Sequence, residues 1–250
     1  MRSCTRSSIF VGKAAMSEGT MSEGTPTVGV IIPVRNAARY LGRALESVLS
    51  QQPAPMDVLV VDGASNDSSV SVARAFPGVR VVDQHGRGLA AARNEGLKSV
   101  LGEVVAFCDA DDRWSKDALA VRLAVLEDRP ATIAVMGRVV LEEIEGAVPN
   151  AAQRQRIGRS VPGFTPGALL ARRKAFDLVG VFDEELTIGC DSDWFVRLQQ
   201  SSAPWMQIEA IVLRKGARGD SLSTDVGHYR RELLTVARRF VNRRRKASDL

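Results

Sequence analysis

The sequence contains little cysteine and little histidine. Its 250 residues include three cysteines, Cys4, Cys108 and Cys190, and two histidines, His85 and His228. The cysteines lie far apart and form no Cys-x-x-Cys motif, so neither a disulfide framework nor a structural zinc site is predicted. Because unpaired thiols are typical of a reducing compartment, we expect a cytoplasmic protein.

Long apolar runs and the common phosphate-binding loops are also absent. No apolar stretch approaches the roughly 20 residues that a membrane-spanning helix needs, so we expect a soluble protein. The chain has neither the loop G-x-x-x-x-G-K followed by Ser or Thr nor a G-x-G-x-x-G motif after its first predicted strand. A bound diphosphate would therefore need other groups to neutralise its charge. With 45% apolar residues, the chain can bury the core of one domain with appendages.

Positive charge is concentrated near the C-terminus. Between Arg214 and Lys246 there are eleven Lys or Arg residues and three acids, an excess of +8 that leaves about −3 for the rest of the chain. Within 227–250, apolar residues recur at helical spacing among eight basic residues, at Tyr229, Leu233, Val236, Ala237, Phe240 and Val241. This pattern predicts a basic amphipathic helix and tail, which could pack on its own domain or contact an anionic membrane surface. We expect no nucleic-acid partner.

The N-terminal segment 1–25 is polar and repetitive. Residues 16–20 have the sequence MSEGT, which is repeated at once in residues 21–25. The segment shows no hydrophobic periodicity, and its apolar part is too short for a secretory signal. We therefore expect residues 1–25 to form a disordered leader.

Short apolar segments alternate with helical patterns after this leader. Strands are predicted at Val28–Pro33, Val58–Val61, Val79–Val82 and Val104–Phe107, and helices after an N-cap at Asn36 and over Ser68–Phe76 and Gly88–Val100. Strands and helices that alternate at this spacing predict an α/β fold with a mostly parallel sheet flanked by helices. Ligands of such sheets bind beyond the carboxyl ends of the strands.

Polar loops follow three of these strands. They are Pro33–Asn36, Asp62–Asp67 and the acidic tetrapeptide Asp109–Asp112. Three carboxylates at one sheet edge repel one another unless a cation is near, and oxygen ligands suit magnesium or manganese. Arg87 and Arg93 could add fixed positive charge beside a diphosphate. Simpler roles are open for two of the acids, because Asp112 could cap the following helix and Asp67 could form an Asx turn.

Six motifs in a fixed order give the chain its resemblance to a known family. They are PVRN after the first strand, VDGASND after the second, GLAAARNEG at the start of a helix, CDADDRW after the fourth strand, VGVFDEEL at 179–186 and CDSDWFVRL at 190–198. Over about Thr27 to Thr224, the chain resembles the family 2 glycosyltransferases of the GT-A fold. The resemblance implies a single GT-A-like (Rossmann-like) domain at 26–226.

The first half of that domain, about 26–115, would bind a nucleotide sugar. In the family, the first loop and the acid matching Asp62 contact base and ribose. The acid matching Asp111 holds a divalent metal, Mn²⁺ or Mg²⁺, and Asp109 lies near both metal and ribose. The expected nucleotide-sugar contacts are Pro33, Val34, Asn36, Asp62, Arg87, Arg93, Asp109, Ala110 and Arg218. Members often place a His where this chain has Arg218, which could contact the diphosphate but cannot ligate the metal.

The second half, about 116–226, would bind the acceptor. An acidic pair precedes a helix in the family, and its second acid acts as general base. Here the pair is replaced by Cys190-Asp191, with Arg197 at the expected spacing, so Asp191 is the expected base. A simpler interpretation also stays open, in which Asp191 is a first-turn acid and Asp193 forms an ordinary i, i+4 pair with Arg197.

The resemblance thus implies an inverting, metal-dependent glycosyltransferase that uses a nucleoside diphosphate sugar, with a UDP-sugar favoured. The acceptor hydroxyl could belong to a small molecule, a peptide or a glycan. Two alternatives stay open. One is a nucleotidyltransferase that forms a nucleotide sugar and releases pyrophosphate. The other is a catalytically silent nucleotide- or peptide-binding module, which the changes at Cys190 and Arg218 make conceivable.

Overall fold

The computed structural model describes residues 25–145, 147–219 and 226–248. The leader expected at 1–25 therefore lies outside the described residues except for Thr25. Within the described ranges, no helix is both long and apolar enough to cross a membrane.

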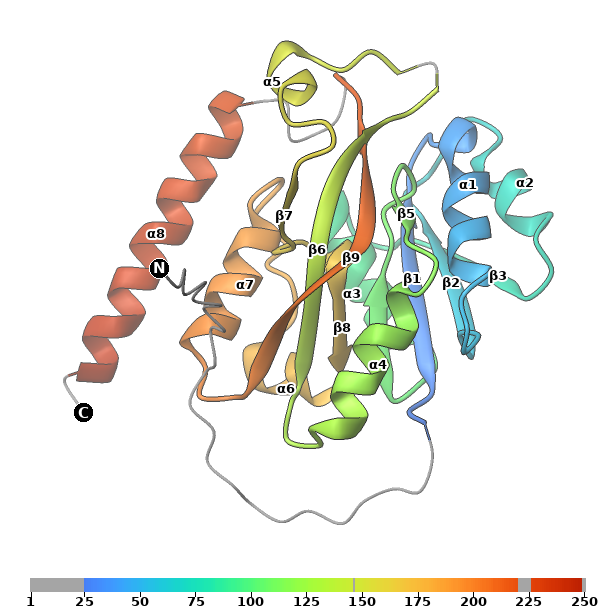
Figure 1. Ribbon diagram of the computed structural model, residues 1–250. Coiled ribbons are helices and arrows are strands. Elements are labelled where there is room, and N and C mark those ends of the chain that lie inside the picture. Colours follow the sequence, from blue (N-terminus) through green and yellow to red (C-terminus); the bar gives the residue numbers. More distant parts are fainter. Residues whose placement is uncertain (1–24, 146, 220–225, 249–250) are drawn as a thin grey trace, which may run out of the picture.

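The first half of the sheet is parallel. Its elements are β1 (Val28–Val34), α1 (Ala38–Leu49), β2 (Asp57–Asp62), α2 (Ser69–Arg74), β3 (Val79–Asp83), α3 (Gly88–Ser99) and β4 (Val104–Phe107). The strands lie in the order β3-β2-β1-β4, and each pair of neighbours is parallel. Their carboxyl ends therefore meet at one edge, which is the uppermost edge of the sheet in Figure 1.

The second half of the chain extends this sheet with mixed pairing. Its elements are β5 (Arg113–Trp114), α4 (Ala118–Asp128), β6 (Ala134–Glu143), α5 (Ala151–Arg154), β7 (Ser160–Pro162), β8 (Leu169–Arg172), α6 (Lys174–Val179), α7 (Cys190–Gln200), β9 (Trp205–Ala217) and α8 (Val226–Ser248). The order continues β4-β8-β6-β9-β5, with β8 antiparallel to both β4 and β6, and β9 parallel to β6 but antiparallel to β5. The end of β9 is thereby carried to the same edge as the end of β4.

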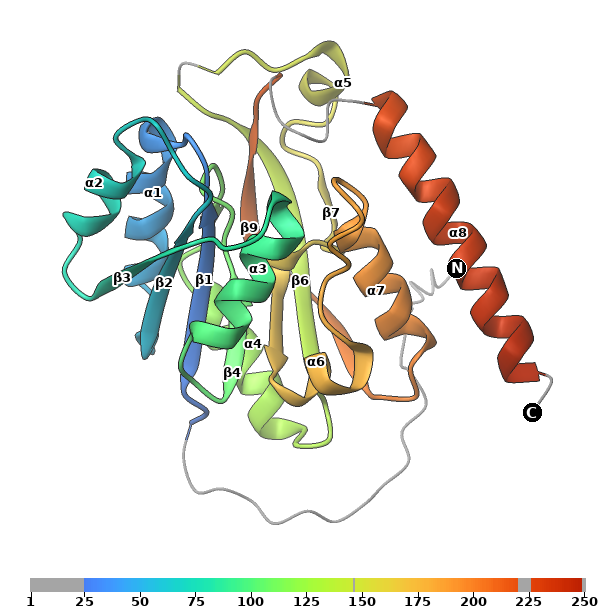
Figure 2. The same ribbon diagram turned by 180° about the vertical axis from the view of Figure 1, so that it is seen from behind.

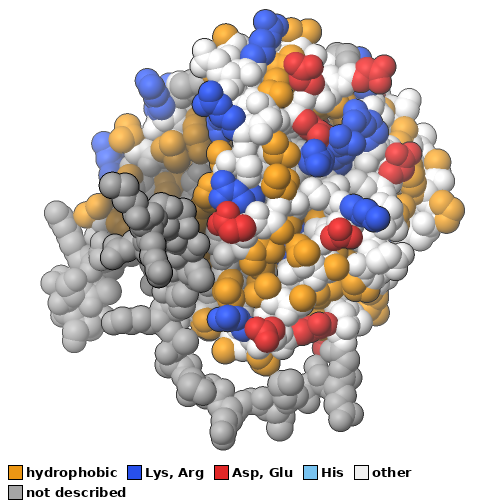
Figure 3. Space-filling view, viewed as in Figure 1, with side chains coloured by type: hydrophobic (Ala, Val, Ile, Leu, Met, Phe, Trp, Pro, Cys, Tyr) orange, Lys and Arg blue, Asp and Glu red, His pale blue; other side chains and the backbone are white. Residues whose placement is uncertain are grey.

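Helices cover both faces of the sheet, as Figures 1 and 2 show from opposite sides. Alternate residues of β1 enter different cores, because successive side chains of a strand point to opposite faces. Val30 and Ile32 pack with α1, α2 and α4, whereas Ile31 packs in the core formed with α3, α6 and α7. The predicted α/β fold is confirmed. Basic and acidic side chains are interspersed over the face seen in Figure 3.

The predicted N-cap at Asn36 is wrong. The N-cap of α1 is Ala37, which has no side chain that could cap the helix. Asn36 instead adopts a left-handed backbone with φ of 50°. The N–H groups of Ala37 and Ala38 donate to Ser69 Oγ (2.9 Å) at the start of α2 and to Asp67 Oδ2 (3.0 Å) in the loop before it. The first turn of α1 is therefore capped by side chains about 30 residues later in the sequence.

The terminal helix α8 packs on α7 through one face. Val236 is buried in the core shared with α7, while Leu234 and Val241 are exposed on the opposite face of α8. Gln200 Nε2, at the end of α7, donates to the carbonyl oxygen of Phe240 (3.2 Å). Of the two arrangements considered for the predicted basic helix, the structure has the one in which it packs on its own domain.

Candidate active site

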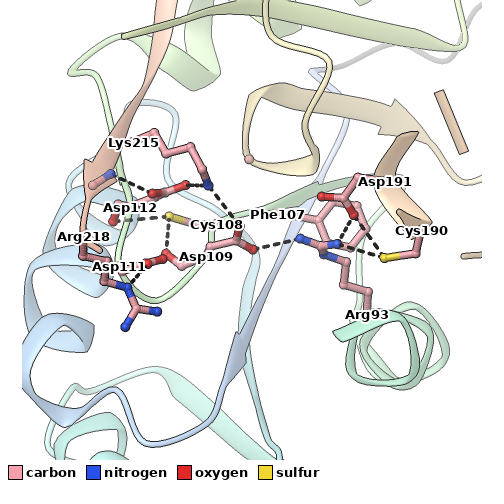
Figure 4. A network of polar contacts seen from close by, with 12 residues as sticks. Arg93, Phe107, Cys108, Asp109, Asp111, Asp112, Cys190, Asp191, Lys215 and Arg218 are labelled. Carbon is pink, nitrogen blue, oxygen red and sulfur yellow. Dashed lines mark hydrogen bonds and ion pairs between the residues drawn. The ribbon is translucent and has the colours of Figure 1, made fainter. Parts of the chain in front are cut away.

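The acidic tetrapeptide at the carboxyl end of β4 lies among three cations that come from distant parts of the chain. Arg93 on α3, Lys215 on β9 and Arg218 just after β9 each bind at least one of its carboxylates, as Figure 4 shows. The charge repulsion expected among the three acids is therefore relieved by protein side chains. Of these cations, Lys215 was not singled out from the sequence, where it counted only as part of the basic C-terminal stretch.

Asp112 has a structural role that the sequence did not indicate. Its Oδ1 accepts from the backbone N–H of Gly216 (2.9 Å), and its Oδ2 accepts from Lys215 Nζ (3.1 Å). The next helix, α4, has Asp117 as its N-cap, so the interpretation of Asp112 as a helix cap is wrong. Burial raises the pKa of Asp112, the neighbouring charges of Asp111 and Asp109 raise it further, and Lys215 opposes them. Asp112 thus fixes β9 to the end of β4.

Asp111 faces Arg218. The Nε of Arg218 donates to Asp111 Oδ2 (2.6 Å), and its guanidinium carbon lies 5.4 Å from the centre of the Tyr40 ring of α1. This contact places Arg218 beside the acidic tetrapeptide, where the sequence predicted a diphosphate-binding residue. Tyr40 is a second member of the site that the sequence did not reveal.

Arg93 connects Asp109 with Asp191. Its side chain is fully buried; Nη2 donates to Asp109 Oδ1 (3.0 Å), and Nη1 donates to Asp191 Oδ1. Asp191 lies in the first turn of α7, so the acid of the predicted donor half and the expected base share one guanidinium (Figure 4). Because Arg93 has no exposed surface and both of its terminal nitrogens bind carboxylates, its position differs from that of an open diphosphate-binding cation.

The two carboxyl groups bound by Arg93 titrate differently. Burial raises the pKa of Asp109, but the charges of Arg93 and Lys215 outweigh it and hold this pKa below its ordinary value. Burial also raises the pKa of Asp191, where the opposing charge of Arg93 is not sufficient and the charge of Asp109 adds to the rise. Two neighbouring acids with pKa values displaced in opposite directions are typical of a site with separate binding and acid–base roles.

The loops after β1 and β2 are joined at the same edge of the sheet. Asn36 Oδ1 accepts from the N–H of Asn66 (2.8 Å), and its own N–H donates to Ser65 Oγ (2.9 Å). Asp67 accepts from the N–H of Ser69 (2.9 Å), as expected for an Asx turn. These contacts hold the first two polar loops together.

Asp62 ends β2 with one unused acceptor. Its Oδ2 accepts from the N–H of Ser65 (3.1 Å), whereas its buried Oδ1 accepts no hydrogen bond from the residues that the structure describes. A buried carboxylate oxygen without a donor is costly. A ligand hydroxyl or N–H group at this position would satisfy it.

The other expected contacts of the nucleotide sugar are placed as follows. Pro33 and Val34 are the buried last residues of β1, and Ala110 is buried between Asp109 and Asp111. Arg87 is exposed at the N-cap of α3, and its side chain forms no hydrogen bond or ion pair within the described part of the chain. The structure thus brings Arg93, Asp109, Asp111, Arg218 and Asp191 together and leaves Arg87 without a contact to them.

The donor set fits a divalent cation that is shared with a ligand. Among the described residues there is no group of three or more His, Cys, Asp or Glu side chains that could hold a metal by themselves. Mg²⁺ and similar cations are commonly bound by one or two carboxylates together with substrate phosphates. Asp111, with a side chain that is 15% exposed, and the neighbouring Asp109 could provide such carboxylate oxygens.

Comparison with known sequences identifies relatives of this chain. The family model described as Glycosyl transferase family 2 matches residues 29–180, which is more than half of the chain. The succinoglycan biosynthesis protein ExoU of Rhizobium meliloti is 31% identical over 229 residues, which cover 81% of this chain and 66% of ExoU. For three further relatives, whose names describe them as glycosyltransferases, the match spans only 17% to 48% of the relative's length.

Solved structures share the fold. Residues 1–349 of TarS from S. aureus, in complex with UDP-GlcNAc, align with a TM-score of 0.62 at 20% identity, covering 80% of this chain and 61% of TarS 1–349. The mannosyltransferase PcManGT of Pyrobaculum calidifontis, in complex with GDP-Man and Mn²⁺, aligns with a TM-score of 0.58 at 24% identity, covering 77% and 57% of the two chains. These alignments confirm the expected GT-A-like fold.

Proposed function

Since this chain belongs to glycosyl transferase family 2, we propose that it transfers a sugar from a nucleoside diphosphate sugar to an acceptor hydroxyl, with inversion at the anomeric carbon. A UDP-sugar is the favoured donor. The proposal includes the division of the domain 26–226 into a donor half, about 26–115, and an acceptor half, about 116–226. The proposal also treats residues 227–250 as a basic C-terminal segment outside that domain.

One observation carries the proposal, namely the shared contact of Arg93 with Asp109 and Asp191. Asp109 lies near the end of the donor half and Asp191 lies in the first turn of α7 in the acceptor half, yet both carboxylates bind the same buried guanidinium. A transferase needs its donor site and its base at this proximity, because the acceptor oxygen must attack the sugar while it loses its proton. A module that only binds a nucleotide has no need for the second acid.

The donor would lie along the carboxyl ends of β1, β2 and β4. The unused Oδ1 of Asp62 is suited to a hydroxyl or N–H of the nucleoside, and Pro33, Val34 and Asn36 border the same edge. TarS was solved with UDP-GlcNAc and PcManGT with GDP-Man, so both nucleotides belong in any test of the donor.

The charge of the diphosphate would be met by a metal and by basic side chains. Asp111 and Asp109 would hold Mn²⁺ or Mg²⁺, which when bound stabilises negative charge on the leaving nucleoside diphosphate. Arg218 and Lys215 lie beside the same carboxylates and would contact phosphate oxygens directly. Fixed positive charge that faces the leaving group stabilises the transition state more than the ground state.

Asp191 would act as the general base. Its side chain is 24% exposed, so it can reach an acceptor hydroxyl, while burial of its remainder raises its pKa. A carboxylate with a raised pKa takes up the proton of the attacking hydroxyl more readily. Arg93 would hold this carboxylate toward the donor half. In-line attack opposite the leaving diphosphate inverts the anomeric configuration.

Glycans are the first acceptors to test. ExoU is described as a succinoglycan biosynthesis protein, and succinoglycan is a polysaccharide. A polysaccharide intermediate therefore ranks ahead of the small-molecule and peptide acceptors that the sequence left open.

The decisive experiment is a panel of UDP-sugars and GDP-mannose, assayed with Mn²⁺ for release of the nucleoside diphosphate, first alone and then with oligosaccharide acceptors. We expect one donor to be consumed, faster with acceptor, and a product whose anomeric configuration is opposite to that of the donor by NMR. Asp191→Asn is the matched variant and should slow transfer by ~10²- to 10⁴-fold.

Other results would contradict the proposal in distinct ways. Consumption of a nucleoside triphosphate with a sugar phosphate, with release of pyrophosphate, would identify a nucleotidyltransferase. Tight binding of UDP without turnover of any donor would identify a silent binding module. Transfer by Asp191→Asn at the wild-type rate would support the proposed activity but would show that Asp191 is not the general base.

A further inference from the structure

The terminal helix α8 contacts the turn before α7 through one carboxylate. Glu232 accepts hydrogen bonds from three consecutive backbone N–H groups of this turn. Oε1 accepts from Thr187 (2.8 Å), and Oε2 accepts from Ile188 (2.8 Å) and Gly189 (2.6 Å). The Glu232 side chain is 12% exposed, so the contact is largely shielded from water.

This contact provides hydrogen-bond acceptors for backbone N–H groups that have no acceptor within the turn. Gly189 is the N-cap of α7 and has no side chain, so α7 has no cap of its own. Consecutive N–H groups that converge on one anion form a strong binding site, and hydrogen bonds to an ionised group are about twice as strong as neutral ones. Although burial opposes it, the N–H groups of the turn and His228 lower the pKa of Glu232 to about 2. Glu232 is therefore ionised at neutral pH.

Two further contacts of α8 lie on either side of Asp191. The hydroxyl of Tyr229 is 3.2 Å from Ser192 Oγ, the residue directly after Asp191. A Cβ on Gly189, two residues before Asp191, would lie 3.2 Å from the Cβ of Glu232, so α8 lies directly against the backbone there. The contacts from α8 thus bracket the residue that is proposed as the base.

We infer that Glu232 is a positioning residue for Asp191, in that it fixes the turn 187–189 so that the first turn of α7 presents Asp191 to Arg93 and the donor half. This inference rests on the proposed role of Asp191 as general base. The expected effect is on the rate rather than on donor binding, because Glu232 hydrogen-bonds the turn 187–189 and His228 of its own helix, and neither belongs to the donor half. A shift of the base by about 1 Å can lower a rate by roughly 100-fold.

The test compares Glu232→Ala and Glu232→Gln with Arg239→Gln in the full-length chain. Arg239 is the matched control, because it also joins α8 to the segment before α7, at Asp183 and Glu185, without contacting the turn 187–189. The measurements are kcat, the KM for the donor, and hydrogen–deuterium exchange of the peptide 186–193.

Glu232→Ala should lower kcat by roughly 10- to 100-fold and speed exchange in the turn, with the donor KM changed by no more than about twofold. Glu232→Gln keeps an oxygen acceptor and loses the charge, so its kcat should fall less. If Glu232→Ala does not fold, the Glu232→Gln variant still tests the inference. Arg239→Gln should keep kcat within about threefold of the wild type.

A wild-type kcat in both Glu232 variants would overturn the inference. An equal loss in Arg239→Gln would also overturn it, because the effect would then belong to docking of α8 in general. If the wild-type protein transfers no sugar, the proposed function fails. Hydrogen–deuterium exchange then still tests the role of Glu232, because unchanged exchange in Glu232→Ala would show that Glu232 does not order the turn 187–189. If Asp191→Asn loses activity while the Glu232 variants keep it, only this inference fails.

Discussion

Arg93 and Asp191 are 98 residues apart in the sequence, yet the buried guanidinium of Arg93 donates a hydrogen bond to the Asp191 carboxylate. The second terminal nitrogen of Arg93 donates to Asp109 at 3.0 Å. One side chain of α3 therefore fixes the end of β4 relative to the first turn of α7. The two halves of the proposed active site meet at this guanidinium.

Removal of the Arg93 charge should destabilise the protein strongly. In Arg93→Met, two largely buried carboxylates would lose their shared partner, which typically costs about 3–5 kcal/mol. Urea unfolding measures this change. Arg87→Met, an exposed position six residues earlier on the same segment, is the control and should change stability by less than about 0.5 kcal/mol.

A second substitution should recover part of the stability that Arg93→Met loses. In Arg93→Met combined with Asp191→Asn, the charge of Asp191 is gone and Asp109 keeps its contact with Lys215, so the double variant should be more stable than Arg93→Met alone. If Arg93→Met unfolds at the wild-type urea concentration, the guanidinium does not hold the two acids together.

The rate of transfer should depend on pH through Asp191. The base must be ionised to accept a proton, and burial raises the pKa of Asp191 above its ordinary value of 3.8. The rate should therefore fall as the pH is lowered, with a midpoint above 3.8 in a plot of kcat/KM against pH. Asp191→Asn should lose this acidic limb along with most of its activity. A limb that persists unchanged in Asp191→Asn would assign the titration to another group.

Metal-dependent nucleotide binding should require Asp111. With Mn²⁺ present, Asp111→Asn should weaken UDP binding at least roughly tenfold, which corresponds to about 1.4 kcal/mol, because a carboxylate ligand is lost. Calorimetry with Mn²⁺ and with EDTA separates the metal from other effects, since wild type and variant should bind UDP similarly in EDTA. Asp117→Asn, an exposed acid nearby, is the control. Equal Mn²⁺-dependent affinity in Asp111→Asn would place the metal elsewhere.

Glu232 should make the folded state sensitive to acid. Its pKa is lowered from 4.5 to about 2 in the folded protein, so its stabilising effect is complete above about pH 4.5 and is lost as the pH falls toward 2. Hydrogen bonds to a charged group typically contribute about 1.5–3 kcal/mol. Glu232→Gln should be less stable than wild type at pH 7 in urea unfolding, and the difference should narrow toward pH 2. A difference that stays constant over this range would show that the charge of Glu232 contributes nothing.

Local patterns in the sequence were sufficient for the parallel half of the fold. The apolar run Val104–Phe107 has the bounds of β4, and the acids that follow it lie at the predicted edge of the sheet. Such predictions succeed because a buried strand and the loop after it are specified by neighbouring residues.

Contacts between distant segments were the part that the sequence could not supply. Asn36 is a residue type that often caps helices, but Asp67 and Ser69, just before and at the start of α2, accept from the N–H groups at the start of α1 instead. Asp112 is likewise a residue type that often caps helices, but its carboxylate instead binds Lys215 and Gly216, which lie more than 100 residues later in the sequence. In both cases, tertiary contacts outweighed a local preference that is worth only about 1 kcal/mol.

The sequence by itself determined the α/β order of the first four strands and the three polar loops at their carboxyl ends, because the alternation of apolar and polar residues is a local property. Only the tertiary structure decided which cation meets which acid. Arg93, Lys215 and Arg218 reach the acidic tetrapeptide from α3, from β9 and from the segment just after β9. Glu232 reaches the turn before α7 from the terminal helix. Those pairings follow from how helices and strands pack across the whole chain, which no periodicity within a short window encodes.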